Sequence, residues 1–258
     1  MRVPTLYSFV PTLVGVGLLV VVSIVVLWAY RAPHRFAPAL AILRGTIQLA
    51  ILSFILSGVI TNGWWVALAL VVMFGVAAVT AARRLGWNWS RFALVSFAMA
   101  AGIVPTALVV FGTGAIELTS RFALAIGGIV IGNSMTIATL AGRRFAEATY
   151  DHWEEVEGWL ALGATRREST LQLARNAVYS ALIPSTDQTK TTGLVALPGA
   201  FVGAIFGGLS PLEAGRFQIV VLASIMAAGS ITAVILIRIL APVRVRPAVQ
   251  LPLAQLGV

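Results

Sequence analysis

The sequence predicts an all-α, multi-pass membrane protein with seven transmembrane helices. Hydrophobic residues make up 59% of the 258 residues, and charged residues only 10%. Apolar stretches recur along the chain at about 20 residues, the length that crosses the hydrocarbon core of a bilayer as a helix. Basic residues are also distributed unevenly among the segments that join these stretches, as the positive-inside rule requires.

Six stretches are long enough to cross a bilayer. A seventh, Gly193–Leu209, is shorter and is interrupted by Pro198 and Gly199, because proline lacks the backbone N–H that continues a helix. The first stretch has no small-residue cleavage signal, so we expect it to be retained as a helix. The six longer spans are Phe9–Tyr30, Phe36–Ile60, Trp64–Ala82, Phe92–Gly112, Phe122–Ala141 and Ile219–Leu240.

The basic residues predict the orientation of a single transmembrane domain over residues 1–258. With the N-terminus outside and the C-terminus inside, Arg2, Arg121 and Arg216 face outward, and Arg44 lies within a span. A net charge of +9 can indicate nucleic-acid binding, but here the basic residues follow the positive-inside rule of membrane proteins. We therefore expect a lipid bilayer as partner, and no nucleic acid. The cytoplasmic residues would be Arg31, Arg35, Arg83, Arg84, Arg91, Arg143, Arg144, Arg166, Arg167, Arg175, Lys190, Arg238, Arg244 and Arg246.

One long polar segment, about residues 142–192, is expected as a cytoplasmic loop. Residues Trp153, Val156 and Leu160 recur at helical spacing, which predicts an amphipathic helix. Gly163 follows as the glycine that ends a helix. A Thr-x-x-Glu capping box at residues 165–168 predicts a second helix along the inner membrane face. By periodicity alone, an interfacial anchor is as good an interpretation as a docking site.

Several motifs, in this order, resemble the FetB/YbbM family of ABC permeases, to which plant aluminium-sensitivity membrane proteins are related. They are "RGTIQL" (44–49), "GNSMT" (132–136), "LALGAT" (160–165), "GLVALPGAFVGAIFGG" (193–208) and "SPLEAGRFQIV" (210–220). In addition, "EGWLALG" (157–163) is similar to the EAA loop, which docks on the ATPase in importer-type ABC permeases.

The resemblance implies a permease for iron export. The bias towards arginine, alanine, valine and glycine is typical of a bacterial protein, so we expect it in a bacterial inner (plasma) membrane. The resemblance further implies a homodimer driven by a separate ABC ATP-binding subunit, which holds the ATP and magnesium, so that this chain binds no cofactor itself. The residues expected to contact the ATPase are Glu157, Leu160, Gly163, Ala164 and Thr165.

The spans contain a few polar residues that are candidates for the translocation path. Arg44 and Gln48 are one turn apart in the second span, where an arginine costs at least ~2.5 kcal/mol unless it is paired or hydrated. Either they line the path or contact an anionic ligand, or Arg44 extends to the headgroups.

Two more candidate positions are open to a structural and a functional interpretation. Asn133 and Ser134 either bond across helices or line the path beside Met135. Pro198 and Gly199 would form a mobile gate or a close-packing seam.

Other functions lack sequence support. Lys190-Thr191 is preceded by threonine rather than glycine, so there is no P-loop for ATP. With no cysteine and only His34 and His152, both in predicted loops, a metal site cannot be assigned. No protease or hydrolase motif is present, so we expect no enzyme. A seven-helix receptor or sensor remains the alternative.

Overall fold

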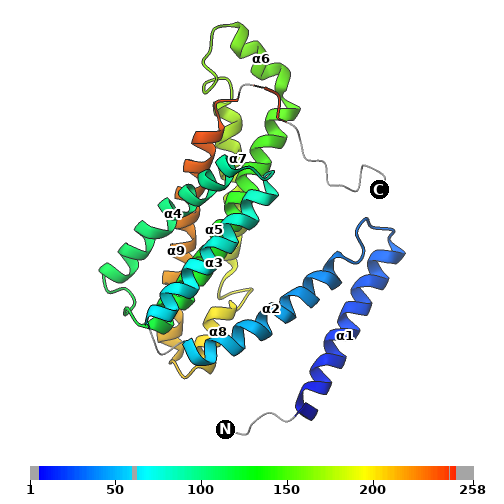
Figure 1. Ribbon diagram of the computed structural model, residues 1–258, viewed down its shortest axis with the longest axis vertical. Helices are drawn as coiled ribbons and strands as arrows, with labels where there is room; N and C mark the ends of the chain where they lie inside the picture. Colours follow the sequence, from blue (N-terminus) through cyan, green and yellow to red (C-terminus); the bar gives the residue numbers. More distant parts are fainter. Residues whose placement is uncertain (1–5, 60–62, 244, 248–258) are drawn as a thin grey trace. The chain divides into compact units, whose positions relative to one another are not determined.

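The computed structural model describes residues 6–59, 63–243 and 245–247, and of residues 6–9 and 54–59 it describes the backbone alone (Figure 1). Within these ranges every named element is an α-helix, which confirms the all-α class. The chain divides into two compact units, the first containing Met1–Val59 and the second Ile60–Gln250. That residues 1–258 act as a single transmembrane domain stays a prediction.

The first unit is a helical hairpin. Helix α1, Leu6–Ala29, packs against α2, Ala37–Val59. The connection turns sharply because Arg31 and His34 adopt positive φ angles of 55° and 57°, which are uncommon for residues other than glycine. The predicted end of the second span at Ile60 lies outside the described residues.

Four long helices form the frame of the second unit: α3 (Gly63–Arg84), α4 (Trp89–Gly112), α5 (Ser120–Asp151) and α9 (Pro211–Leu240). Helix α4 packs along α3, α5 and α9, and α5 also packs along α3 and α9. Small residues allow a close approach of α4 and α9, since a Cβ on Gly102 would collide with the carbonyl of Ala228. Such small residues are typical of helix contacts in membranes, where backbones pack closely.

Two of these helices extend beyond the predicted spans. Helix α5 continues past the expected end at Ala141 to Asp151, and α9 begins at Pro211 rather than Ile219. The start of α9 is a capping box, in which the Ser210 N–H donates to Glu213 Oε2 at 3.0 Å and the Glu213 N–H donates to Ser210 Oγ at 3.3 Å. The Ser-Pro-Leu-Glu sequence carried this signal, whereas the span prediction considered hydropathy alone.

The polar segment folds differently from the expected loop. Its first helix, α6 (Trp153–Ala161), is confirmed. Its second, α7 (Leu171–Thr191), packs into the bundle along α5 and α9 and does not lie along the membrane face. The reason is a stripe of small residues, Ala174, Ala177 and Ala181, which is buried in a core with residues of α5 and α9. The expected loop of 142–192 therefore shortens to the region around α6.

The predicted short span, 193–209, contains a single eight-residue helix, α8 (Gly199–Phe206). At 1.5 Å per residue this helix is about 12 Å long, too short to cross a bilayer. In Figure 1, α7, residues 192–198 and α8 follow one another along the bundle from its α6 end to the opposite end. The predicted span over 193–209 is therefore not a continuous helix, and α8 is its only helical part in the described structure.

Among the described residues, five helical segments are long and apolar enough to cross a membrane. The described apolar part of α2, Ala37–Ser53, is shorter. The total of seven spans and their orientation stay predictions. The five segments are Val10–Ala29, Gly63–Arg84, Trp89–Gly112, Ser120–Asp151 and Pro211–Leu240.

Candidate functional site

The predicted ATPase-contacting residues lie together at the end of the bundle where α5 and α9 terminate (Figure 1). We call residues 153–170 the docking segment: it comprises α6, a glycine turn and a second turn that leads into α7. Val156 anchors it, with only 1% of its surface exposed. Leu160 and Ala164 are half-buried, and Glu157, Gly163 and Thr165 are exposed.

The glycine turn ends α6 with the hydrogen bonds of a Schellman motif. Gly163 has a φ of +90°. Its N–H donates to the carbonyl of Leu160 at 3.0 Å, and the N–H of Ala164 donates to the carbonyl of Trp159 at 3.0 Å. A side chain at Gly163 would be strained because L-residues rarely adopt this conformation. The sequence prediction of a helix-ending glycine is confirmed.

A capping box fixes the next turn. The Thr165 N–H donates to Glu168 Oε2 at 2.8 Å, and the Glu168 N–H donates to Thr165 Oγ1 at 3.3 Å. The hydrogen bond from the Thr165 hydroxyl, at 2.7 Å, and then that from its backbone N–H hold the pKa of Glu168 below its usual value. Helix α7 begins only at Leu171, so the box closes a separate turn instead of starting that helix.

Two hydrogen bonds connect the docking segment to the end of α9. The buried Thr170 hydroxyl donates to the carbonyl of Ala241 at 2.7 Å. The Arg167 guanidinium donates to the carbonyl of Arg238 at 3.3 Å. The last carbonyls of a helix lack partners within it, so these contacts join the segment to α9 by bonds that α9 itself leaves open.

Other arginines bind carbonyls at helix ends on the same side of the bundle. Arg91 donates to Gly86 at 2.8 Å, and Arg143 donates to Arg84 at 3.4 Å. Arg246 donates to the carbonyl of Tyr150 at 3.0 Å and lies 4.1 Å from the centre of its ring. Helix C-termini carry partial negative charge, so this basic band compensates the ends of α3 and α5.

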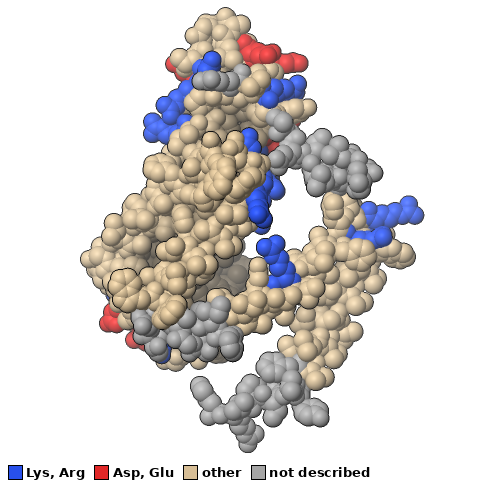
Figure 2. All heavy atoms as spheres, viewed as in Figure 1, with Lys and Arg blue, Asp and Glu red and all other residues tan. Residues whose placement is uncertain are grey.

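The outer surface of α6 is acidic. Glu154, Glu155 and Glu157 are exposed, and Figure 2 shows acidic groups at this end of the molecule beyond a band of basic ones. The Glu157 carboxylate accepts a hydrogen bond from the Trp153 indole at 2.7 Å, which holds both side chains on one face of α6. An acidic helix of this kind can recognise a basic groove on a partner.

The other predicted residues lie outside the docking segment in the sequence, and each is described within its own unit. Arg44 and Gln48 belong to the first unit, where both are exposed on α2 and their side chains make no hydrogen bond to the described residues. Pro198 is the residue before α8, with an extended backbone, and Gly199 is the first residue of that helix.

The polar residues of the fifth span, Asn133 and Ser134, differ in their hydrogen bonds. Asn133 donates to the carbonyl of Ile129 in its own helix at 2.9 Å. Ser134 is 1% exposed, and its hydroxyl has no hydrogen-bond partner in the described structure. Met135 packs against the core between α3, α4 and α5. No bond across helices is formed by Asn133 or Ser134 in the described part of the chain.

Sequence reasoning missed the polar residues at the end of α7. Asp187 and Lys190 were placed in a cytoplasmic loop, whereas they lie on a helix of the bundle. The alanines at positions 174, 177 and 181 were the available signal, because small residues at helical spacing favour close packing. Within the described residues no group of three or more His, Cys, Asp or Glu side chains could hold a metal ion.

Comparison with known proteins identifies the family. A family model described as "Uncharacterised protein family (UPF0014)" matches residues 10–243. The chain belongs to the UPF0014 family. This UPF0014 protein is therefore a multi-pass membrane protein, and the resemblance drawn from its motifs is confirmed.

Three relatives illustrate the family. The UPF0014 membrane protein STAR2 of rice is 34% identical over 197 residues, covering 76% of this chain and 69% of the relative. The Arabidopsis protein ALUMINUM SENSITIVE 3 is 33% identical, covering 74% and 71%. The Escherichia coli protein named "Probable iron export permease protein FetB" is 30% identical, covering 74% and 75%. No solved structure matches the UPF0014 chain.

Proposed function

We propose that this UPF0014 protein is the membrane-spanning permease subunit of an ABC transporter that exports iron or a similar metal ion. A separate ATP-binding subunit supplies ATP and magnesium, and two copies of the chain form the pathway. The proposed location is a bacterial inner membrane, with the α6 end in the cytoplasm. The substrate class comes from the name of the FetB relative.

The observation that carries the proposal is the direct connection between the docking segment and the bundle. Thr170 bonds to the carbonyl of Ala241, the C-cap residue of α9, and Arg167 bonds to that of Arg238 in its last turn. The segment also continues without a break from α5 on one side and into α7 on the other. A force applied to α6 would therefore act on three bundle helices at once, which is what a nucleotide-driven conformational switch needs.

The acidic surface of α6 supports a protein partner. Exposed carboxylates on a short helix that projects from the bundle are available to a basic groove, and electrostatic complementarity favours such an encounter. The receptor or sensor alternative assigns no role to this projecting helix, and no feature of the described residues favours it.

The proposal is tested by purifying the chain with a candidate ATP-binding subunit and measuring ATP hydrolysis and metal transport in liposomes. We expect Gly163→Ala to uncouple hydrolysis from transport, because alanine at φ +90° is strained by about 1–2 kcal/mol and distorts the turn. Transport should fall while the bundle stays folded.

The matched control is Gly114→Ala. Gly114 also has a positive φ, +67°, and open space around it, but it follows α4 at the opposite end of the bundle. The same backbone strain there should leave coupling unchanged. Normal transport by the Gly163 variant, or equal uncoupling by both variants, would contradict the assignment of the docking segment.

A further inference from the structure

The arginines of α5 and α9 define the depth of the bundle that lies in the membrane. Arg121 and Arg143 both lie on α5, and Arg216 and Arg238 both lie on α9, with a spacing of 22 residues within each pair. At 1.5 Å per residue both separations are about 33 Å. The hydrocarbon core of a bilayer is about 30 Å thick, so the four arginines mark its two faces.

The polar end of α7 lies inside these limits. Leu182 packs level with Gly229, where a Cβ would meet Ile137 and Leu182. Gly229 is nine residues before Arg238, and Asp187 is five residues further along α7 than Leu182. Each residue of a helix adds 1.5 Å along its axis, so these nine and five residues together place Asp187 about 20 Å from the level of Arg238. This depth is within the hydrocarbon core.

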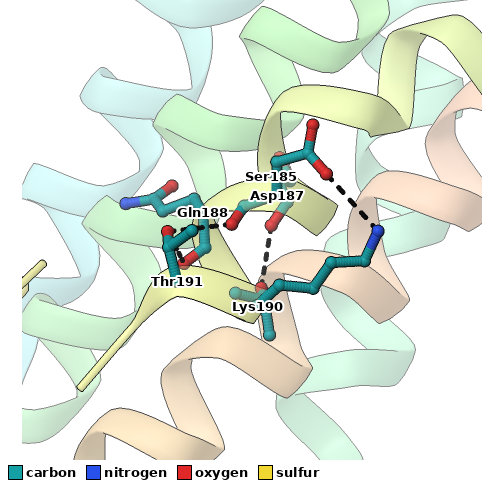
Figure 3. Close-up of polar contacts among 6 residues, drawn as sticks. Ser185, Asp187, Gln188, Lys190 and Thr191 are labelled. Atoms are coloured by element: carbon teal, nitrogen blue, oxygen red, sulfur yellow. Dashed lines mark hydrogen bonds and ion pairs between the residues drawn. The ribbon is translucent and has the colours of Figure 1, made fainter. Parts of the chain in front are cut away.

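Several polar groups at this depth point away from the core of the bundle. Asp187 and Lys190 form an ion pair at 3.4 Å with 62% and 71% of their side chains exposed, respectively. Figure 3 shows the Lys190 side chain extending back along α7 to the Asp187 carboxylate. The side-chain amide of Gln188 is exposed and makes no hydrogen bond within the described residues.

The hydroxyl groups of the last turn bond to the backbone of the same helix. Thr191 donates to the carbonyl of Asp187 at 2.9 Å, and Thr192 donates to the carbonyl of Gln188 at 2.7 Å. The second of these bonds satisfies a carbonyl that the end of a helix leaves open. Among the described residues at the end of α7, the Asp187 carboxylate and the Gln188 amide are thus groups that can bind a solute.

The backbone after α7 is non-helical. The N–H groups of Val195 and Ala196 both donate to the carbonyl of Thr191, at 3.0 and 3.2 Å, and the Gly193 N–H donates to Ala196 at 2.9 Å. In a membrane, non-helical backbone is tolerated where it is buried in protein or lines a water-filled cavity. Charged side chains at membrane depth follow the same rule.

We propose that residues 185–192 line a water-filled path for cations, in which Asp187 binds a partly hydrated divalent cation and Lys190 serves as its internal counter-ion. Oxygen ligands from a carboxylate and an amide suit a cation that keeps part of its water shell. Lys190 balances Asp187 when the path is empty, and the arriving cation displaces the ammonium group. This inference rests on the proposed transport function and names its site.

The water-filled path can be tested without any ATPase. The chain contains no cysteine, so Gln188→Cys introduces a single thiol into the membrane-embedded protein. We expect a hydrophilic maleimide to label it at least about tenfold faster than a thiol in lipid, because only hydrated thiols form the reactive thiolate. Thr191→Cys is a second variant on the same face, should the first fail to fold.

The matched control is Val71→Cys. Val71 is 68% exposed on α3 and lies 13 residues before Arg84, about 20 Å deep and therefore level with Asp187. Equal labelling rates at residues 71 and 188 would overturn the water-filled path, and would leave the docking segment unaffected.

The cation role is tested by Asp187→Asn in the complete transporter, with Fe²⁺ under anaerobic conditions as the probe. We expect Fe²⁺-stimulated ATP hydrolysis and Fe²⁺ transport to fall at least about tenfold, because the change removes the anionic ligand of the cation, while basal hydrolysis persists. Lys190→Gln should lower the Fe²⁺ concentration for half-maximal stimulation. Glu117→Gln, an exposed carboxylate after α4, is the control.

The outcomes separate the two proposals. Wild-type Fe²⁺ stimulation and transport in the Asp187 variant would overturn the cation site alone. A wild-type chain that never assembles with an ATP-binding subunit would overturn the transport function, whatever the labelling result.

Discussion

At the scale of single residues, arginine and threonine side chains complete the ends of helices. Thr170, Arg167 and Arg246 each donate a hydrogen bond to a backbone carbonyl at the end of a helix. The basic residues behind the positive-inside pattern therefore also have a local role in this fold. Their side chains lie at helix C-termini, which carry partial negative charge. The sequence predicted the side on which these residues gather, and the structure assigned their partners.

Glu168 makes one of these turns dependent on pH. Hydrogen bonds from Thr165 hold its pKa below the usual value in the folded state. The stabilisation is therefore fully present above the ordinary glutamate pKa and is lost as the pH falls through the lower, folded-state pKa. We expect the difference in melting temperature between wild type and Glu168→Gln to disappear at acidic pH.

The measurement is a pair of thermal unfolding series across this pH range. Thr165→Val is the companion variant, since it removes the hydroxyl that is the larger cause of the pKa shift. A stability difference that stays constant with pH would contradict a role for ionised Glu168.

At the scale of helices, small residues decide which elements pack together. A Cβ on Gly102 would collide with the carbonyl of Ala228 and the hydroxyl of Thr232, which joins α4 closely to α9. Backbone cannot move aside as a flexible side chain can, so the helices themselves would have to separate.

We expect Gly102→Ala to destabilise the bundle by about 1–3 kcal/mol, the usual cost of overpacking. The measurement is thermal or denaturant unfolding in detergent. Gly75→Ala is the control, because a Cβ added to Gly75 on α3 would meet nothing within 4 Å and alanine favours helix. Equal stability of the two variants would contradict the close α4–α9 contact.

At the scale of the whole molecule, the basic band and the docking segment lie at one end of the second unit, and the α4–α5 connection lies at the other. The positive-inside rule then predicts that the docking segment faces the cytoplasm. The ATP-binding subunit that we propose as partner would reach α6 from that side.

We expect Leu162→Cys, 82% exposed, to react with a membrane-impermeant thiol reagent only when cells are opened. Leu118→Cys, 73% exposed near the start of α5, should react in intact cells. Since the chain has no cysteine of its own, no other residue of the protein reacts with the thiol reagent. The reverse pattern would invert the topology and remove the ATPase as a partner for α6.

Much of the architecture was predictable because it follows from local sequence. Apolar length located α3 and α4 to within three residues at each end, and Gly163 ended α6 as its position indicated. The extra length of α5 and α9 was missed because polar residues continue a helix beyond the apolar core. For α9, the Ser210 capping box recorded the true start.

The sequence by itself determined the membrane class, the family motifs and the turn at Gly163, because hydropathy, periodicity and a left-handed glycine act over a few neighbouring residues. Only the tertiary structure decided that α7 packs between α5 and α9, with the Asp187–Lys190 ion pair on its exposed side. The physical reason is that the sequence of an amphipathic helix shows which of its faces will be buried, but not against which other helix. Its partner here is set by small residues on helices distant in the chain.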